Sequence, residues 1–400
     1  MVVAACSGDD EPDAASTTTV PPPTTVPSRP DDGILKLGAF LPTTGPGAAL
    51  GSPMVEAVQT AVRLINESGG VLGQDVELIV ADESDETGVE SLLDDGVDAI
   101  IGPASSLVAL SELGSIVHPV TGVVSCSPSA TALALDTFPD NNFFFRTVPS
   151  DSLQMTAIGR RITATGRTSV AIGYLDDPYG RGLASALRSD LSARSALEVV
   201  ADVGFSGDQE NLSEPAAELL AADPGVVVVL GDADDGSRLL TALDEATRDG
   251  TPPAIIVNDA IRSARQTVQA LSPGFREQIV GVSPLSRSVI DTGPSGFFTA
   301  HAFDCVNLIA LAAVEAGSDA PTKFRAHIPA VSVGGRSCTS FHDCAELIAD
   351  GLRIDYSGAS GVVELSNSTG DPTRARFELF RFNADGVDEP MPGASTFEAP

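Results

Sequence analysis

Short strands of the buried type, alternating with helices, are the feature that most constrains this chain. Eight apolar runs rich in valine and isoleucine recur from residue 34 onward, without the strict alternation of a half-exposed strand. Segments with helical periodicity separate them. Such alternation predicts parallel sheets covered by helices on both faces. The predicted strands are 34–41, 76–81, 97–101, 120–125, 170–174, 199–203, 226–230 and 254–257.

The clearest predicted helix has Ser52 as its N-cap and Pro53 at its first position, and Gly69-Gly70 ends it. Its apolar residues recur on one face, as expected for a helix that packs on a sheet. The other predicted helices are 107–117, 152–165, 182–194, 215–222, 237–249 and 298–316.

The length of the chain indicates two lobes. Without its first 33 residues the 400-residue chain still has 367, more than the roughly 250–300 at which a single core stops growing. One strand–helix series precedes Pro149 and a second follows it, and Pro149 and Pro284 lie in polar passages where the chain can cross. We expect an α/β fold of two doubly wound parallel-sheet lobes. Their predicted segments are 34–149 plus 285–357 for lobe 1 and 150–284 plus 358–397 for lobe 2.

The charge balance excludes two classes of partner. The chain has 55 acidic and 23 basic residues, for a formal charge of −32, and only two of the basic residues are lysines, Lys36 and Lys323. Nucleic acids and anionic membrane surfaces are bound through clusters of lysine and arginine. We therefore expect no nucleic-acid partner.

The N-terminus suggests a lipid anchor. Residues 1–6, MVVAAC, resemble the end of a bacterial lipoprotein signal with Cys6 as the acylated residue, although most of the signal is missing. Residues 7–33 contain six prolines, five threonines and six acids, so they bury too little apolar surface to order and should form an extended, disordered tether. We predict an extracytoplasmic protein anchored to the cell membrane through Cys6. The alternative is an ordinary free cysteine.

The other four cysteines suit an oxidising compartment. Cys338 and Cys344 can close a seven-residue loop, which would contribute about 2.4 kcal/mol on the chain-entropy estimate. A metal site from Cys338, His342 and Cys344 is the alternative, but zinc motifs usually supply four ligands, so the disulfide is favoured and no metal is expected. Cys126 and Cys305 either pair or remain two buried thiols.

Polar residues follow the predicted strands at the edge where open parallel sheets bind ligands. In lobe 1 these segments carry serine and threonine hydroxyls and helix-start N–H groups, which bind anions. In lobe 2 they carry aspartates and a tyrosine, which suit a cation. A ligand with a carboxylate and an ammonium, an amino acid, would bridge the two sets, although any single such residue is more often a helix cap. The segments are 42–47, 102–106 and 127–131 in lobe 1 and 176–180, 231–235 and 258–259 in lobe 2.

Short motifs along the chain occur in an order typical of one family. They are GAFLPTTG (38–45), INESGGVLG (65–73), Asp82, IIGP (100–103), SPSAT (127–131), FRTVPSD (145–151) and Tyr179-Gly180. From about residue 34 to residue 390 the chain resembles the branched-chain amino-acid (Leu/Ile/Val) binding family of ABC-transporter substrate-binding lipoproteins, which have the type I periplasmic-binding fold. The resemblance implies two lobes joined by three crossovers, with the ligand in the cleft between them.

The resemblance also implies roles for residues of both lobes. Two serines at a helix start and the 129–131 segment would hold the ligand's carboxylate, Tyr179 would close over the ligand, and Asp259 would bind the ammonium group. Leu50 and Asp232 replace residues that are often aromatic in amino-acid binders, so another amino acid, an amide or urea-like compound, or a more cationic molecule stays open as the ligand. The candidate ligand-binding residues are Ser105, Ser106, Ser129, Ala130, Thr131, Tyr179, Asp232 and Asp259.

These observations predict the extracytoplasmic solute-binding component of an ABC importer, monomeric and without a cofactor, whose membrane partner is an ABC permease. A receptor lipoprotein that feeds a signalling partner and an interaction lipoprotein with a vestigial cleft are the alternatives. An enzyme is the least favoured class, because the sequence has no G-x-S-x-G elbow, Walker loop or H-E-x-x-H motif and its four histidines are scattered.

Overall fold

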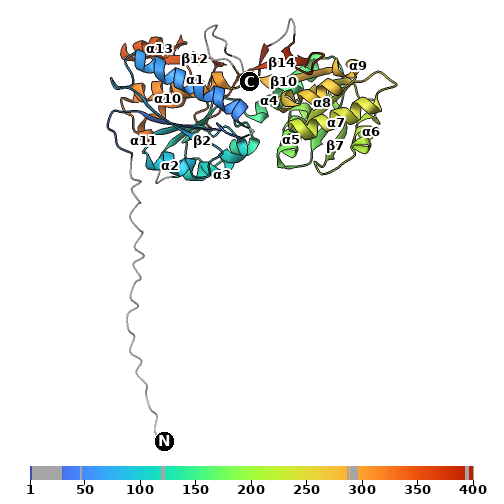
Figure 1. Ribbon diagram of the computed structural model, residues 1–400, viewed down its shortest axis with the longest axis horizontal. Helices are drawn as coiled ribbons and strands as arrows, with labels where there is room; N and C mark the ends of the chain where they lie inside the picture. Colours follow the sequence, from blue (N-terminus) through green and yellow to red (C-terminus); the bar gives the residue numbers. More distant parts are fainter. Residues whose placement is uncertain are drawn as a thin grey trace.

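The structure, a computed structural model, describes residue 1 and residues 29–45, 47–118, 122–285, 288, 296–391 and 396–399. Within these ranges the chain forms two α/β lobes that lie side by side (Figure 1). Cys6 and residues 7–28 lie outside the described residues. Residues 29–33 were expected to belong to the disordered tether, but they contact lobe 1, where the backbone N–H groups of Asp32 and Gly33 donate to the buried Asp319 carboxylate.

Lobe 1 is built on a five-stranded parallel sheet in the order β2-β1-β3-β4-β5. Helices α1 and α10 pack together on one side of the sheet, and α2 and α3 lie on the other (Figure 1). A small three-stranded sheet, β11-β12-β13, extends the lobe. The strands are β1 (Lys36–Leu41), β2 (Glu77–Asp82), β3 (Ala99–Ile101), β4 (Val124–Ser127), β5 (Phe144–Arg146), β11 (Arg336–Cys338), β12 (Ile354–Gly358) and β13 (Gly361–Val362). The helices are α1 (Ala48–Glu67), α2 (Gly88–Asp94), α3 (Ser106–Ile116), η1 (Leu133–Leu135), α10 (Thr299–Ala316), α11 (Pro321–Phe324), α12 (His327–Ala330) and α13 (Phe341–Ala349).

Lobe 2 contains an eight-stranded sheet in the order β15-β14-β10-β9-β8-β6-β7, with β16 paired to β14. Strands β6 to β10 are parallel, and β14 runs antiparallel beside β10. Separate apolar clusters cover its two faces, one with α4 and α5 and the other with α6 to α8. The strands are β6 (Ser169–Leu175), β7 (Glu198–Phe205), β8 (Val226–Leu230), β9 (Ala254–Val257), β10 (Ile279–Pro284), β14 (Ala375–Phe382), β15 (Asp388–Pro390) and β16 (Thr396–Ala399). The helices are α4 (Asp151–Ala164), α5 (Pro178–Ser192), α6 (Ser213–Leu220), α7 (Ala233–Ala246), η2 (Asp259–Ser263), α8 (Arg265–Ala270) and α9 (Pro273–Arg276).

Three crossovers join the lobes. The first lies between β5 and α4 and the second between β10 and α10. After the small sheet the chain stays in lobe 1 longer than expected, because Val363 and Leu365 are buried in the lobe 1 core. The third crossover therefore follows Leu365, and the predicted boundary at residue 358 falls too early.

The first helix also begins earlier than predicted. It starts at Ala48 with Gly47 as its N-cap, so Pro53 lies inside the helix instead of at its first position. The extra turn packs closely on the loop after β1, where a Cβ on Gly51 would lie 1.8 Å from the carbonyl oxygen of Pro42. Glycine permits this contact. The packing of the added turn, which the N-cap pattern did not reveal, brings Leu50 towards the other lobe.

Both disulfides form. Cys126 of β4 bonds to Cys305 of α10, and Cys338 bonds to Cys344. The second bond excludes the alternative metal site, because its thiolates are consumed. Helix α10 is the one helix of the described ranges that is long and apolar enough to cross a membrane, but 78% of it is buried, as in the core helix of a soluble lobe.

Candidate ligand-binding site between the lobes

The predicted anion-binding helix start in lobe 1 already holds a carboxylate of the chain itself. The backbone N–H groups of Ala104 and Ser105 donate to the two carboxylate oxygens of Glu83, at 2.8 and 2.7 Å. Glu83 follows β2 and is buried, and burial raises its pKa in spite of these bonds. An internal anion at the N-terminus of α3 satisfies the helix dipole. These two N–H groups are therefore engaged within lobe 1.

Three serines hold the loop that leads into α3. The hydroxyls of Ser125, Ser127 and Ser129 donate to the carbonyl oxygens of Gly102, Pro103 and Ala104, at 2.7, 2.5 and 2.9 Å. Ser125 and Ser127 are alternate residues of β4 and therefore point the same way, towards this loop. Ser129 lies two residues past Ser127, where β4 ends, and bonds to the same loop. Ser129, predicted as a ligand contact, thus has a positioning bond inside lobe 1.

The segment after Ser129 contributes mostly backbone groups. The N–H of Thr131 donates to the hydroxyl oxygen of Ser106 at 3.1 Å, which joins two of the predicted residues directly. Ala130 is fully buried, and its N–H donates to Ser127. The carbonyl oxygen of Thr131 accepts from the N–H of Asp151, at the start of α4 in lobe 2, at 2.9 Å. Thr131 is therefore the predicted lobe 1 residue that reaches the other lobe.

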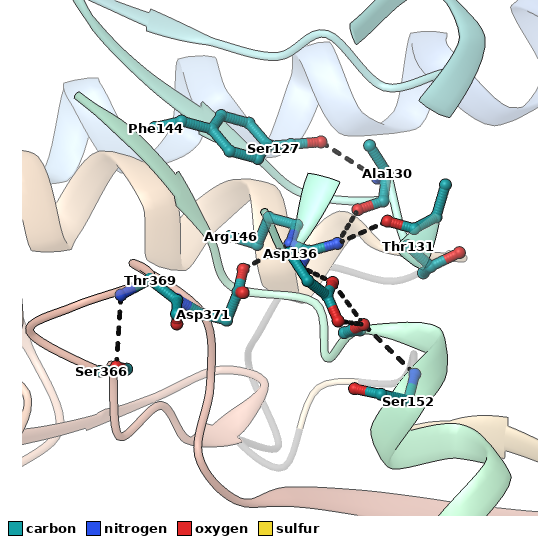
Figure 2. A network of polar contacts seen from close by, with 12 residues as sticks. Ser127, Ala130, Thr131, Asp136, Phe144, Arg146, Ser152, Ser366, Thr369 and Asp371 are labelled. Atoms are coloured by element: carbon teal, nitrogen blue, oxygen red, sulfur yellow. Dashed lines mark hydrogen bonds and ion pairs between the residues drawn. The ribbon is translucent and has the colours of Figure 1, made fainter. Parts of the chain in front are cut away.

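The side chain of Arg146 holds this segment in place (Figure 2). Its guanidinium is completely buried and pairs with Asp136 and Asp371, both at 2.6 Å, and it donates to the carbonyl oxygens of Ala130 and Ala132. Although burial acts against the charged form, the two carboxylates raise the pKa of Arg146. Because Asp371 belongs to the third crossover and Arg146 precedes the first, the network ties both crossovers to the candidate site.

Lobe 2 contributes Tyr179 from the first turn of α5. The helix begins there because Asp177 caps it, accepting from the Gly180 N–H at 2.7 Å. The Tyr179 hydroxyl accepts from the side-chain amide of Asn258 at 3.2 Å. Burial, followed by the nearby Asp151 and Asp259, raises the Tyr179 pKa well above its ordinary value, so its hydroxyl stays protonated. It can both donate to a ligand and accept from one.

Asp259 lines a cavity of about 440 Å³ between the lobes. Its carboxylate accepts from Nε2 of Gln154 at 2.8 Å, and burial raises its pKa. The neighbouring Arg262 does not neutralise it fully, because that guanidinium pairs with Glu378 at 2.8 Å and lies over the Phe380 ring at 4.3 Å. The cavity is lined by Ala49, Leu50, Asp259, Ala260, Arg262, Ser263, Ser283, Phe297 and Phe298. It thus combines a carboxylate with an apolar wall.

Asp232 has a different role from the other candidates. It is exposed at the surface of lobe 2, and its carboxylate caps α7 by accepting from the Asp235 N–H at 2.8 Å. The cap accounts for an aspartate at this position without a ligand.

We expect Asp232→Ala to lower the free energy of unfolding by about 1 kcal/mol, the usual cost of losing an N-cap. Ligand affinity should stay at the wild-type value, because the carboxylate is exposed and caps α7. Urea unfolding and calorimetric titration of the same preparation would measure both quantities. A loss of affinity with unchanged stability would return Asp232 to the ligand site.

Helix α4 connects predicted residues of the two lobes, because the Asp151 N–H donates to Thr131 and the Gln154 amide donates to Asp259. Asn258, next to Asp259, donates to Tyr179. Four other predicted residues make hydrogen bonds within lobe 1, next to Thr131: Ser105, Ser106, Ser129 and Ala130. Sequence reasoning missed Asp151 and Gln154. These two are one helical turn apart, which places them on one face of α4, but at a helix start they look like an ordinary acidic first turn.

Two α/β lobes with three crossovers and a lined cavity between them define a two-lobed solute-binding protein of the type I periplasmic-binding fold. A family model described as "Periplasmic binding protein" matches residues 34–287, and the chain belongs to that family.

Relatives and solved structures agree. The chain is 28% identical to the chemotactic signal transduction system substrate-binding protein BasB of Halobacterium salinarum, over 82% of this chain and 83% of that protein. It is 28% identical to the Leu/Ile/Val-binding protein BraC3 of Rhizobium johnstonii, over 88% and 93%. An ABC transporter substrate-binding protein of Desulfitobacterium hafniense in complex with Leu has the same fold, with a TM-score of 0.67, 19% identity, and coverage of 90% of this chain and 99% of that one.

Proposed function

We propose that the protein is the extracytoplasmic solute-binding component of an ABC importer and that it binds an amino acid between its lobes. The observation that carries the proposal is the cavity that Leu50 of lobe 1 and Asp259 of lobe 2 line together. Hydrogen bonds of Asn258 and of α4 connect Tyr179 and Thr131 to the same region. The Thr131 hydroxyl on the lobe 1 side can donate to a carboxylate group of the ligand, and Asp259 on the lobe 2 side can accept from its ammonium group. Relatives named as Leu/Ile/Val-binding proteins support this ligand class.

The cavity wall favours an apolar side chain on the ligand. Leu50 comes from α1 of lobe 1, and Phe297 and Phe298 come from the segment before α10. Burying an apolar side chain against such a wall contributes roughly 1.5–3 kcal/mol, and hydrogen bonds to charged groups contribute roughly 1.5–3 kcal/mol each. Together they suffice for micromolar affinity, which needs about −8 kcal/mol, after the cost of closure.

We expect the lobes to close when a single ligand contacts both of them. A ligand shifts the equilibrium towards the closed form only if it binds that form better. The closed form would then be the one presented to an ABC permease. We further propose that a lipid on Cys6 and the tether of residues 7–28 hold the monomeric protein beside that permease.

A ligand-sensing receptor is the second candidate. It is favoured by the relative named as a chemotactic signal transduction system substrate-binding protein. Uptake of the bound amino acid by cells with and without the gene would separate the two functions, since an importer component lowers uptake when deleted and a sensor leaves it unchanged.

The ligand itself can be tested by thermal unfolding of the protein against the twenty amino acids, acetamide and urea. An apolar amino acid at a hundred times its Kd should stabilise the fold by about 2.7 kcal/mol. Native mass spectrometry of fresh protein should detect a co-purified compound of that mass. Stabilisation by acetamide or urea alone, or by none of the compounds, would contradict an amino acid as the ligand.

A further inference from the structure

Lobe 1 contains a second cavity, of about 300 Å³, outside the cleft. Helix α1 lines it from Thr60 onward, α10 lines it with Phe303 and Asn307, and residues 339–342, where α13 begins, complete it. Leu50, an α1 residue that lines the cleft cavity, precedes Thr60 by ten residues, which is about 15 Å of helix. The two cavities therefore lie at different ends of α1.

The wall of this second cavity is largely apolar and is held in shape. Leu64 of α1 is 40% exposed, so it lies where the cavity meets solvent, and Phe303 lines the cavity from α10. Phe341 of α13 is only 5% exposed, and the disulfide between Cys338 and Cys344 closes the segment that carries it. A wall that is already ordered loses little freedom when a ligand packs on it. It can therefore bind the apolar body of a small molecule.

The start of α13 offers donors to the same cavity. The Ser340 hydroxyl accepts from the Asp343 N–H at 3.2 Å, and the Ser340 carbonyl oxygen accepts from the Cys344 N–H at 3.1 Å. Among the described residues, the N–H groups of Phe341 and His342 have no acceptor, and both residues line the cavity. Unpaired N–H groups and the positive end of the helix dipole favour an anion at this place.

An independent observation on α10 also indicates a ligand. Asn307 lines the cavity, although only 2% of it is exposed. Its amide nitrogen donates to the carbonyl oxygen of Phe303 at 2.8 Å, whereas its Oδ1 accepts from no donor of the described residues. Buried polar atoms are normally hydrogen-bonded. The Asn307 side chain therefore provides an acceptor for a hydrogen-bond donor of a ligand.

The charges around the cavity favour a neutral donor. Its ionisable lining residues are Glu67 and His342, and 59% of each side chain is exposed. Glu67 pairs with Arg63 at 2.7 Å, and His342 lies 3.5 Å from Glu346. Burying an ammonium group beside the neutral Asn307 would leave its charge without a partner, which is costly. A hydroxyl group supplies the donor without that cost.

We propose that lobe 1 has a second ligand site, which takes a small carboxylate with an apolar body and a hydroxyl group. The carboxylate binds the N–H groups at the start of α13, the apolar body packs on Leu64 and Phe303, and the hydroxyl donates to Oδ1 of Asn307. The 2-hydroxy analogue of leucine, 2-hydroxy-4-methylpentanoate, represents this class of compound. The site uses no residue of the cleft, so it does not depend on the proposed function.

The test is an NMR titration of the full chain with 2-hydroxy-4-methylpentanoate in the presence of excess L-leucine. Asn307→Leu should raise the Kd of the hydroxy acid by about two- to tenfold, because one neutral hydrogen bond is lost while the volume of the side chain is kept. The same acid without its hydroxyl, 4-methylpentanoate, should bind the wild type as weakly as the hydroxy acid binds the variant.

Leu64→Ser tests the apolar wall, and the exposure of Leu64 makes this change safe for the fold. It should raise the Kd of the hydroxy acid by about fivefold, because part of the buried apolar surface is lost. The matched control is Leu352→Ser. Leu352 is also a partly exposed leucine of lobe 1, at 44%, but it follows the other end of α13. This control should keep the wild-type Kd.

Three results would overturn the proposal. Displacement of the hydroxy acid by L-leucine, or weaker binding in Asp259→Ala but not in Asn307→Leu, would mean that the two compounds share the cleft. Absence of binding would overturn the second site directly. Equal affinities for the two carboxylates would overturn the role of Asn307. The proposed function keeps its own test, thermal unfolding with the amino acids, and is unaffected by a failure of this one.

Discussion

Arg146→Ala is expected to lower the free energy of unfolding by about 3–5 kcal/mol, because it removes one partner from a buried ion-pair network. The guanidinium is fully buried, and Asp136 and Asp371 each lie 2.6 Å from it. Without it, two largely buried carboxylates lose their cation, and the carbonyl oxygens of Ala130 and Ala132 lose a donor. Urea unfolding followed by circular dichroism would measure the change.

The matched control is Arg181→Ala. Arg181 also pairs with an aspartate, Asp176 at 2.9 Å, but about half of its side chain is exposed. Exposed pairs contribute roughly 0–1 kcal/mol. Equal urea midpoints for the two variants would contradict the role given to the network in Figure 2. Arg146→Lys should recover only part of the loss, since lysine keeps the charge but not the planar fork that reaches both carboxylates.

The strands that the sequence predicts best are those made almost entirely of apolar residues. Strand β8, Val226–Leu230, is four valines and a leucine, and all five residues are buried. Strands β10 and β14 were not predicted. In β10, IVGVSP, glycine and proline interrupt the apolar run, and in β14, ARFELFRF, charged residues interrupt it. Such segments become strands because they pair with strands far away in the sequence. A local sequence pattern contains no information on that pairing.

The third crossover was misplaced for a similar reason. The buried carboxylate of Asp304 in α10 accepts from the Tyr356 hydroxyl and from the N–H groups of Ala359 and Ser360. These bonds hold residues 356–360 on lobe 1. Because the partners are more than fifty residues apart in the chain, neither the periodicity nor the polarity of residues 356–360 indicates where they go.

For the candidate site, too, the sequence indicates the types of residue and not their contacts. That hydroxyls of one lobe and acids of the other bind the ligand at the cleft stays a prediction, and of the predicted residues Asp259 lines the cavity. The sequence pattern could not separate residues that face the cleft from those that shape it. Whether Ser129 bonds to Ala104, and whether Glu83 fills the helix start, depends on the path of the loop at residues 102–105. Asp232 is an acid, as a contact to an ammonium group would be, but it lies at the start of α7 and caps that helix.

Asp259→Ala is expected to raise the Kd for the bound amino acid by about 10–150-fold, since a hydrogen bond to a charged group contributes roughly 1.5–3 kcal/mol. The fold should be intact, because Asp259 is only partly buried and borders the cavity. Calorimetric titration at pH 8.0 would measure the Kd, and X-ray scattering would show whether saturating ligand still compacts the protein.

Thr131→Ala completes the test from the other lobe. It should also raise the Kd, by about tenfold, since the lost hydroxyl forms a single hydrogen bond. A ligand that contacts both lobes must lose affinity in both variants, whereas one held by lobe 2 alone would lose it only in Asp259→Ala. Because differential binding to the closed form drives closure, the second pattern would also mean that the ligand does not close the lobes. Wild-type affinity in both variants would show that the ligand binds elsewhere.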